Sequence, residues 1–259
     1  MKCSSIKKKL SGSFLISILV LFVVFNLVIL VGASSLQAEN FPLLRRDSEG
    51  SQVEKLQREL SMAGFKISDA TGYFGLQTEI AVEQFQRHQN LTVDGLAGEE
   101  TLSTLKLIQD DKIVPTREVE AVSWSEVDEI FNRTDSVIVT DIASGLSLRV
   151  SRIYGSNHAD VEPINPENVE VLRKIYGGEW SWERRPVVVQ IQDRLIAGSI
   201  TGMPHGENVN GHISDNNFTG HFDIHFQGSR RHKDNAEDEQ HQNMIEKAAE
   251  QEWPLFKSQ

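Results

Sequence analysis

The sequence predicts a multidomain protein, in which an all-α module of three short helices is followed by a β-rich α+β domain. Between residues 45 and 107, apolar residues recur at helical spacing and a glycine–threonine pattern occurs twice. Between residues 124 and 259, short apolar segments alternate with turn residues, as they do in strands. The polar stretch 108–123 separates the two patterns and is predicted to be a linker.

Residues 1–38 are predicted to export the chain. A group of lysines at positions 2 and 7–9 precedes an apolar run over residues 14–33. A helix of this length spans a bilayer core of about 30 Å, and its basic flank stays in the cytoplasm. Small residues follow the run, so that both a cleaved signal peptide and a membrane anchor remain open. Either one places residues 39–259 outside the cytoplasmic membrane.

The charge of the chain excludes some classes of partner. The formal net charge is −11, and the first 38 residues contribute four lysines and no acid, so the remainder is more acidic still. Such a body does not favour nucleic acid or an anionic membrane surface as its main partner. The single cysteine, Cys3, precedes the apolar run, so the folded domains have neither a disulfide nor a cysteine nucleophile.

Residues 45–107 are predicted to form three helices around one small core. The pattern Gly-x-x-Gly-x-x-Thr occurs at 72–78 and again at 95–101, and each copy opens a helix. Glycine suits these tight turns because it adopts positive φ without a steric penalty. The apolar residues at helical spacing are Val53, Leu56, Leu60 and Ala63 in the first helix, Ile80, Ala81 and Phe85 in the second, and Leu102 and Leu105 in the third.

The order of these residues resembles a known family. Val53-x-x-Leu56-Gln57 is followed by Gly72-x-Phe74-Gly75-x-x-Thr78 and then by Asp94-Gly95-x-x-Gly98-x-x-Thr101, as in the peptidoglycan-binding domain of type 1. The resemblance covers nearly the whole module. It implies a three-helix fold and peptidoglycan as the partner, and it leaves the contact residues unknown. We therefore expect a bacterial protein of the cell wall or of the outer face of the cytoplasmic membrane.

Residues 124–259 are predicted to form the β-rich domain, with enough chain for one core. The expected strands are 136–142, 146–151, 186–192, 195–200 and 220–226. The expected helices are 124–133, 166–175 and 234–250.

Seven of the eight histidines lie in this second domain. If residues 220–226 form a strand, its period of two places His221, Asp223 and His225 on one face and apolar side chains on the other. Neutral imidazole and carboxylate are ligands that zinc accepts. The sequence therefore predicts His221, Asp223 and His225 as candidate metal ligands.

A second short segment has the same alternation. His158 and Asp160 are two residues apart and are also candidate metal ligands. His205, at the end of an expected strand, and Glu162 are candidates for a general base acting beside a zinc ion. The three histidines without such a pattern are expected to have structural roles: His88, His232 and His241.

The second domain is similar to two families of cell-wall enzymes. His205-Gly206, followed by the segment 220–225, resembles the signature of the L,D-transpeptidase catalytic domain. In this chain Asp223 occupies the position of the nucleophilic cysteine and His225 that of the arginine. An aspartate does not perform the thioester transfer, so this resemblance implies the fold without the reaction.

The other similarity is to the zinc-dependent wall peptidases, which gather histidine and aspartate around the metal. The residue types match, although the spacing of two between His158 and Asp160 differs from the spacing in that family. Three hypotheses remain open. The protein is a metal-dependent peptidoglycan peptidase, a non-catalytic wall-binding relative of the L,D-transpeptidases, or a structural wall protein with incidental histidines.

Overall fold

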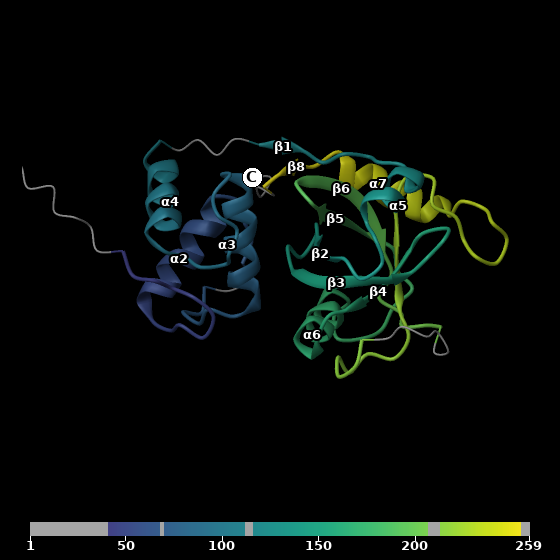
Figure 1. Ribbon diagram of the computed structural model, residues 1–259, viewed down its shortest axis with the longest axis horizontal. Helices are drawn as coiled ribbons and strands as arrows, with labels where there is room; N and C mark the ends of the chain where they lie inside the picture. Colours follow the sequence, from purple (N-terminus) through teal and green to yellow (C-terminus); the bar gives the residue numbers. More distant parts are fainter. Residues whose placement is uncertain (1–40, 68–69, 112–115, 207–212, 255–259) are drawn as a thin grey trace, which may run out of the picture. The chain divides into compact units, whose positions relative to one another are not determined.

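The computed structural model describes residues 41–67, 70–111, 116–206 and 213–254 (Figure 1). The expected export segment at 1–38 lies outside these residues. Within the described ranges, no helix combines the length and apolar character needed to cross a membrane.

The first part of the described chain is the helical module. Its helices are α2 (Ser51–Met62), α3 (Leu76–His88) and α4 (Glu99–Asp111). They enclose a core of fully buried apolar side chains, of which the largest are Leu56, Leu60, Phe65, Phe74, Phe85 and Leu105. The predicted three-helix module is thereby confirmed.

The repeated glycine–threonine pattern has a common hydrogen-bonding plan, which centres on buried glutamines. In the first copy, Gln57 Nε2 donates to the carbonyl oxygen of Tyr73 and to Thr78 Oγ1, both at 2.8 Å. The backbone N–H of Gly72 donates to Gln57 Oε1 at 2.9 Å. The φ angle of Gly72 is 77°, in the region that favours glycine. A glutamine of α2 thus closes the turn that leads into α3.

The second copy repeats this plan one helix later. Gln86 Nε2 donates to Asp94 Oδ1 at 2.8 Å and to Thr101 Oγ1 at 3.1 Å. Gln86 Oε1 accepts the backbone N–H groups of Asp94 and Gly95 at 3.1 and 3.0 Å. The internal repeat in the sequence therefore encodes two equivalent turns, each fixed by the amide of the preceding helix.

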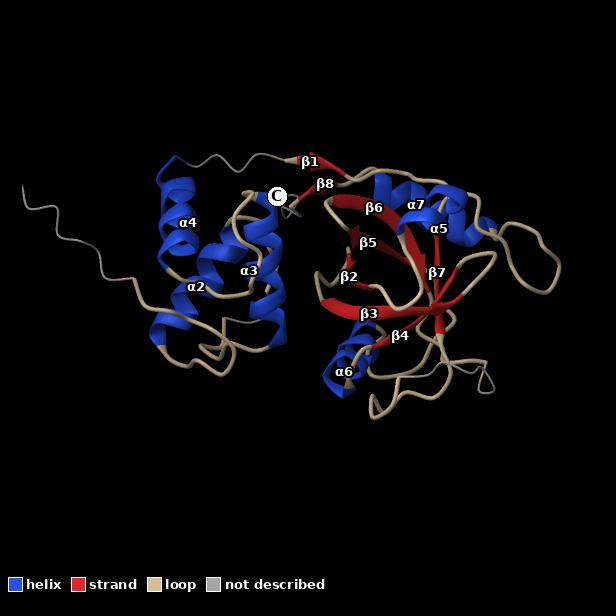
Figure 2. Ribbon diagram, in the orientation of Figure 1, coloured by secondary structure: helices blue, strands red, loops and turns tan. Residues whose placement is uncertain are grey.

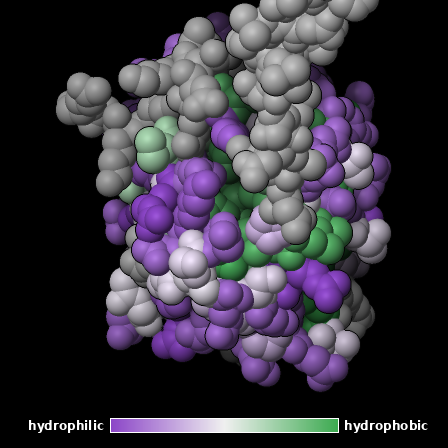
Figure 3. Space-filling model, turned by 90° about the vertical axis from the view of Figure 1, so that its left-hand side faces the viewer, coloured by the Kyte–Doolittle hydropathy of each residue, from purple (hydrophilic) through white to green (hydrophobic). Residues whose placement is uncertain are grey.

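The surface of the module is mixed in character. Figure 3 shows one face of the molecule, on which hydrophilic residues surround a smaller apolar area. Exposed apolar side chains of the module include Leu43, Met62 and Leu107. Single exposed apolar residues are ordinary at protein surfaces, and none of these by itself identifies a peptidoglycan contact.

The second part of the described chain is built on a closed, six-stranded antiparallel barrel (Figure 2). Its strand order is β2-β3-β4-β7-β6-β5. The strands are β2 (Ser136–Asp141), β3 (Ser147–Tyr154), β4 (Ala159–Pro163), β5 (Arg185–Ile191), β6 (Arg194–Ile200) and β7 (Phe222–His225). The predicted β-rich α+β domain is confirmed.

Helices and a short ribbon cover this barrel. α6 (Pro166–Ile175) packs against β3 and β4, whereas α7 (Glu239–Ala249) packs against β5, β6 and β7. α5 (Trp124–Ile130) precedes β2. β1 (Arg117–Glu118) pairs with β8 (Glu252–Trp253), so part of the expected linker is a strand.

The barrel core explains the alternation in its strands. Phe222 and Ile224 of β7 are fully buried in the core together with Ala159 and Val161 of β4. Because successive side chains of a strand point to opposite faces, the residues between them lie on the outer face of the wall. Asp160 of β4 is paired in register with Asp223 of β7. The core and the polar face are therefore made by alternate residues of the same two strands.

Candidate metal centre

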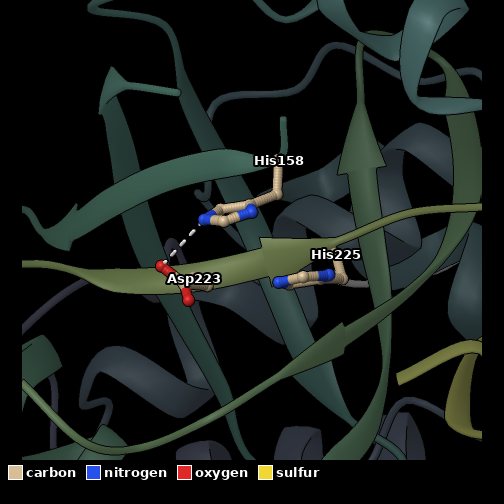
Figure 4. Close-up of side chains that lie close together, drawn as sticks. All are labelled: His158, Asp223 and His225. Atoms are coloured by element: carbon tan, nitrogen blue, oxygen red, sulfur yellow. Dashed lines mark ion pairs between the residues drawn. The ribbon is translucent and has the colours of Figure 1, made fainter. Parts of the chain in front are cut away.

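The paired carboxylates of β4 and β7 form the middle of a histidine-rich cluster on the outer face of the barrel. Asp160 and Asp223 lie opposite each other in an antiparallel pair, an arrangement that is unfavourable for two like charges. Figure 4 shows His158, Asp223 and His225 close together, with an ion pair between His158 and Asp223. The two carboxylates need positive charge beside them, and the surrounding groups supply it in part.

His158 lies directly before β4 and faces both carboxylates. Its Nε2 atom is 3.2 Å from Asp160 Oδ1 and 3.3 Å from Asp223 Oδ1. Its Nδ1 atom is 2.8 Å from the carbonyl oxygen of Arg230, to which it donates. This bond fixes the ring and directs Nε2 at the carboxylates, as is usual for a histidine that binds a metal.

His205 is held in the same way from the other side. Its Nδ1 atom donates to the carbonyl oxygen of Met203 at 3.0 Å, and its Nε2 atom lies 3.2 Å from Asp223 Oδ1. The backbones of His205 and His221 exchange two hydrogen bonds, of 2.9 and 2.8 Å. Two glycines allow this close pairing, since a Cβ on Gly206 would clash with the His221 ring and one on Gly220 with the His205 backbone.

Two further histidines approach Asp160. The Nε2 atoms of His221 and His232 are each 3.8 Å from Asp160 Oδ1. His232 comes from the loop after β7, and its side chain is 52% exposed. His232 has no periodic pattern around it in the sequence, and we expected a structural role. The structure instead places it beside Asp160, a predicted ligand.

The cluster contains buried polar atoms that make no hydrogen bond within the described part of the chain. They are His158 Nε2, Asp160 Oδ1, His221 Nδ1, Asp223 Oδ1 and His225 Nδ1. Several approach one another closely, but not in the geometry of a hydrogen bond. Burying polar groups without partners is costly, so such atoms call for a ligand.

The donor set fits a divalent cation such as zinc. Three groups of residues have one ligand atom each within 4.8 Å of the others: His158–Asp223–His225, His158–Asp160–His232 and His205–His221–Asp223. Each combines imidazole with a carboxylate, the ligand types that zinc accepts. The side chains present are therefore suitable as they stand to hold a zinc ion.

The protonation states follow from burial and charge. Burial opposes ionisation of Asp223, but the contacts with His158 and His205 outweigh it and hold the pKa of Asp223 well below its usual range. Burial likewise disfavours protonated His158, yet its contacts with Asp160 and Asp223 raise its pKa to about 10 in the metal-free protein. A metal ion would replace that proton as the positive charge between the carboxylates.

His225 is the exception to this pattern. Burial, together with the neighbouring histidines, lowers its pKa to about 2. Its ring stacks on His241 of α7, with centroids 3.8 Å apart, and His241 Nδ1 lies 2.9 Å from Ser199 Oγ. Burial also lowers the pKa of His241 to about 4. His225 is therefore neutral at pH 7, the form in which imidazole binds metals.

A cavity of about 260 Å³ opens beside the cluster. Its lining includes His158, His205, Asp223, His225 and His232, together with Trp182, Arg184, Arg231 and Lys233. Trp182 is 50% exposed, and its ring centroid is 5.2 Å from that of His205. The site is therefore accessible from outside and has cationic groups at its edge.

The structure brings together six of the predicted site residues and keeps one apart. Glu162 follows Asp160 on the same strand face, but it is fully buried and does not line the cavity. Its Oε2 atom accepts hydrogen bonds from Asn216 Nδ2 at 2.9 Å and from the Ile213 N–H at 3.1 Å. This carboxylate is engaged in holding the loop before β7, and His205 is the predicted base that faces the cavity.

Residues 49–105 match the peptidoglycan binding domain family. This part of the chain is a peptidoglycan-binding domain. The match confirms the resemblance drawn from the glycine–threonine repeat.

Two curated relatives of the chain are, by name, a lytic enzyme and a zinc carboxypeptidase. The spore cortex-lytic enzyme of Bacillus cereus is 34% identical over 97 residues, which are 36% of this chain and 36% of the enzyme. The zinc D-Ala-D-Ala carboxypeptidase of Streptomyces albus G is 37% identical over 73 residues, which are 26% of this chain and 29% of that protein. The chain thus spans only about a third of the length of these relatives.

An L,D-transpeptidase from Xylanimonas cellulosilytica DSM 15894 is a structural neighbour. It is 22% identical, with 49% of this chain and 59% of that chain covered, and its TM-score is 0.26.

Proposed function

We propose that this protein is an exported, metal-dependent hydrolase of peptidoglycan peptides, brought to its substrate by the helical module. The observation that carries the proposal is the set of buried imidazole and carboxylate atoms that converge without hydrogen-bond partners around Asp160 and Asp223. Both the wall-lytic and the zinc-dependent relatives support this class of reaction.

In this proposal His158, Asp160, His221, Asp223 and His225 hold the metal. Zinc supplies a Lewis acid for a peptide carbonyl and lowers the pKa of a bound water. The hydrogen bonds of His158 to Arg230 and of His205 to Met203 keep both rings oriented before substrate arrives. This preorganisation avoids a conformational cost during the reaction.

His205 is the residue that we assign as general base. It lines the cavity, and its ring is oriented by a carbonyl on one side and by Asp223 on the other. Burial disfavours the protonated ring, but the contact with Asp223 outweighs it and raises the pKa of His205. The imidazole is therefore suited to take up a proton in the site and hold it near a leaving amine.

The edge of the cavity suits a peptide with carboxylate groups. Lys233 and Arg231 line it, and the exposed ring of Trp182 offers an apolar surface for a side chain. The peptides of bacterial walls carry free carboxylates, so this edge complements the proposed substrate.

The experiment is to incubate the purified chain with isolated peptidoglycan, with and without added zinc, and to identify released fragments by mass spectrometry. We expect zinc-dependent release of peptide fragments, reduced at least about 10- to 100-fold in Asp223→Asn, since even the loss of a group that hydrogen-bonds a metal ligand typically has effects of this size. Glu170→Gln, a change on the exposed surface of α6, is the matched control and should retain full activity.

A different outcome would favour the second hypothesis. Asp223 already has ion-pair contacts with two histidines, so its negative charge is partly neutralised without a metal ion. In that state the site could bind a wall peptide without cleaving it. Retention of the chain on peptidoglycan without release of any fragment, at every zinc concentration, would reject the hydrolase and indicate a non-catalytic wall-binding relative of the L,D-transpeptidases.

A further inference from the structure

We propose that the cluster holds two divalent cations in adjacent subsites, and that His232 belongs to one of them. The inference rests on the proposed function in that it uses the same cluster, and it deepens that proposal by assigning the number of ions and the ligands of each. It changes one role: with two ions bound, His205 is a ligand of the second ion, and its assignment as general base applies to a single ion held by the other residues.

Two of the three ligand groups share no residue. The first subsite consists of His158, Asp160 and His232, and the second consists of His205, His221 and Asp223. Each subsite has two imidazoles and one carboxylate, the composition of a three-ligand zinc site that keeps a position open. The strand pairing places Asp160 and Asp223 side by side, so the two subsites are neighbours.

The distances within each subsite suit one ion. Two ligand atoms bound to the same tetrahedral zinc at about 2.1 Å lie about 3.4 Å apart. In the first subsite Asp160 Oδ1 is 3.2 Å from His158 Nε2 and 3.8 Å from His232 Nε2. In the second subsite Asp223 Oδ1 is 3.2 Å from His205 Nε2.

The number of donors exceeds what one ion uses. Seven residues supply ligand atoms to the three groups, whereas zinc is almost always four-coordinate in proteins. A single ion would leave at least three of these side chains without a role, several of them buried. Two ions about 3.5–4 Å apart, as in known two-metal sites, would use six of the seven, and His225 belongs only to the third group, with His158 and Asp223.

The two subsites differ in exposure, which predicts different occupancy. The side chain of His232 is 52% exposed, whereas those of His221 and Asp223 are 8% and 14% exposed. An exposed side chain loses more conformational freedom than a buried one when it binds an ion. We therefore expect the His232 subsite to be the weaker and to lose its ion first on dialysis.

The test is the zinc content of the full chain, freed of metal with a chelator and then loaded with zinc alone. Elemental mass spectrometry and calorimetric titration should both give two equivalents. His232→Ala should retain one equivalent and lose the weaker binding step, and His205→Ala should also retain one. Lys233→Ala, which changes the next residue of the same loop, is the control and should retain two.

The outcomes separate this inference from the proposed function. Saturation of the unchanged chain at one equivalent, or two equivalents retained by His232→Ala, would overturn the two-cation assignment even if the protein cleaves peptidoglycan. Two equivalents without cleavage would keep the assignment and reject the hydrolase. Because His232 is exposed, its replacement leaves the folded barrel intact, and circular dichroism verifies this.

Discussion

The helical module and the barrel both bury polar side chains, but they differ in whether these side chains have hydrogen-bond partners. In the module, Gln57 and Gln86 are each 1% exposed, and both amide ends of each side chain are hydrogen-bonded. In the barrel, His158 and Asp160 are similarly buried, and each has an atom with no hydrogen bond in the described chain. A buried polar network whose atoms are all hydrogen-bonded stabilises one conformation. Buried polar atoms without hydrogen bonds indicate a ligand-binding site.

The comparison predicts first that zinc stabilises the barrel alone. At a zinc concentration of about 1,000 times Kd, a single binding step adds about 4 kcal/mol to the free energy of unfolding. All four tryptophans lie in residues 124–253, so their fluorescence reports the unfolding of the barrel in urea. Amide hydrogen exchange should slow in β4 and β7 and stay unchanged in α3.

An equal stabilisation of both domains by zinc would contradict this prediction, since none of the candidate metal-binding groups lies among the described residues of the module. Magnesium, which binds imidazole poorly, is the matched control ion and should leave the urea midpoint unchanged.

Removing a glutamine should have the next largest effect, and it should act on the module only. Gln86→Ala leaves the half-buried N–H group of Asp94 and the buried N–H group of Gly95 without their acceptor, and we expect a loss of about 3 kcal/mol in the free energy of unfolding. Circular dichroism at helical wavelengths, followed during urea unfolding, measures the change.

The control for this change is Gln52→Ala on the exposed face of α2. It should alter stability by less than about 0.5 kcal/mol. If both substitutions cost the same, the buried network would not be what fixes the turns.

Acidification of the metal-free protein should have the smallest effect and should act on the barrel. The pKa values of His225 and His241 are lowered to about 2 and about 4, against about 6.5 in the unfolded chain. Below pH 6.5 the unfolded chain therefore binds more protons, and stability falls. His158 does not offset this loss, because its raised pKa gives a stabilisation that is fully present below pH 6.5 and is lost only as pH rises towards 10.

We expect a net loss of about 2 kcal/mol between pH 6.5 and pH 5.5 in the tryptophan-detected free energy of unfolding. His241→Gln should reduce the slope, because it removes one of the two buried neutral rings. A barrel whose stability rises over this range would contradict the assignment of neutral rings to His225 and His241.

Much of the fold could be predicted because its signals are local. The glycine–threonine repeat and the alternation in residues 220–226 depend on neighbours in the sequence, and both correspond to elements of the structure. The strand β4 was not predicted, since its pairing partner β7 lies about sixty residues away and its five residues are all buried. Closure of the barrel depends on such distant pairings, which a local pattern does not contain.

The start of α7 and the contacts made by loop residues were harder to predict, because they too depend on contacts that a local pattern does not contain. The expected helix 234–250 begins at residue 239, because Asp238 caps it by accepting the N–H groups of Gln240 and His241. His232 lies in the loop before that helix and has no periodic partner, so only the three-dimensional structure brings it to Asp160. Conversely, Glu162 shared the alternation of Asp160 but is engaged by Asn216, a contact that the sequence does not indicate.

The alternation of β7 side chains between the core and the outer face has a consequence for the evolution of such a protein. Phe222 and Ile224 are buried in the barrel core, while Asp223 and His225, the proposed metal ligands, each follow one position later. One residue exchanged at position 223 alters the chemistry of the outer wall and leaves the interior untouched. Substitutions at the outer-face positions of β7 can therefore change the ligand chemistry during evolution while the barrel core, and with it the fold, is kept.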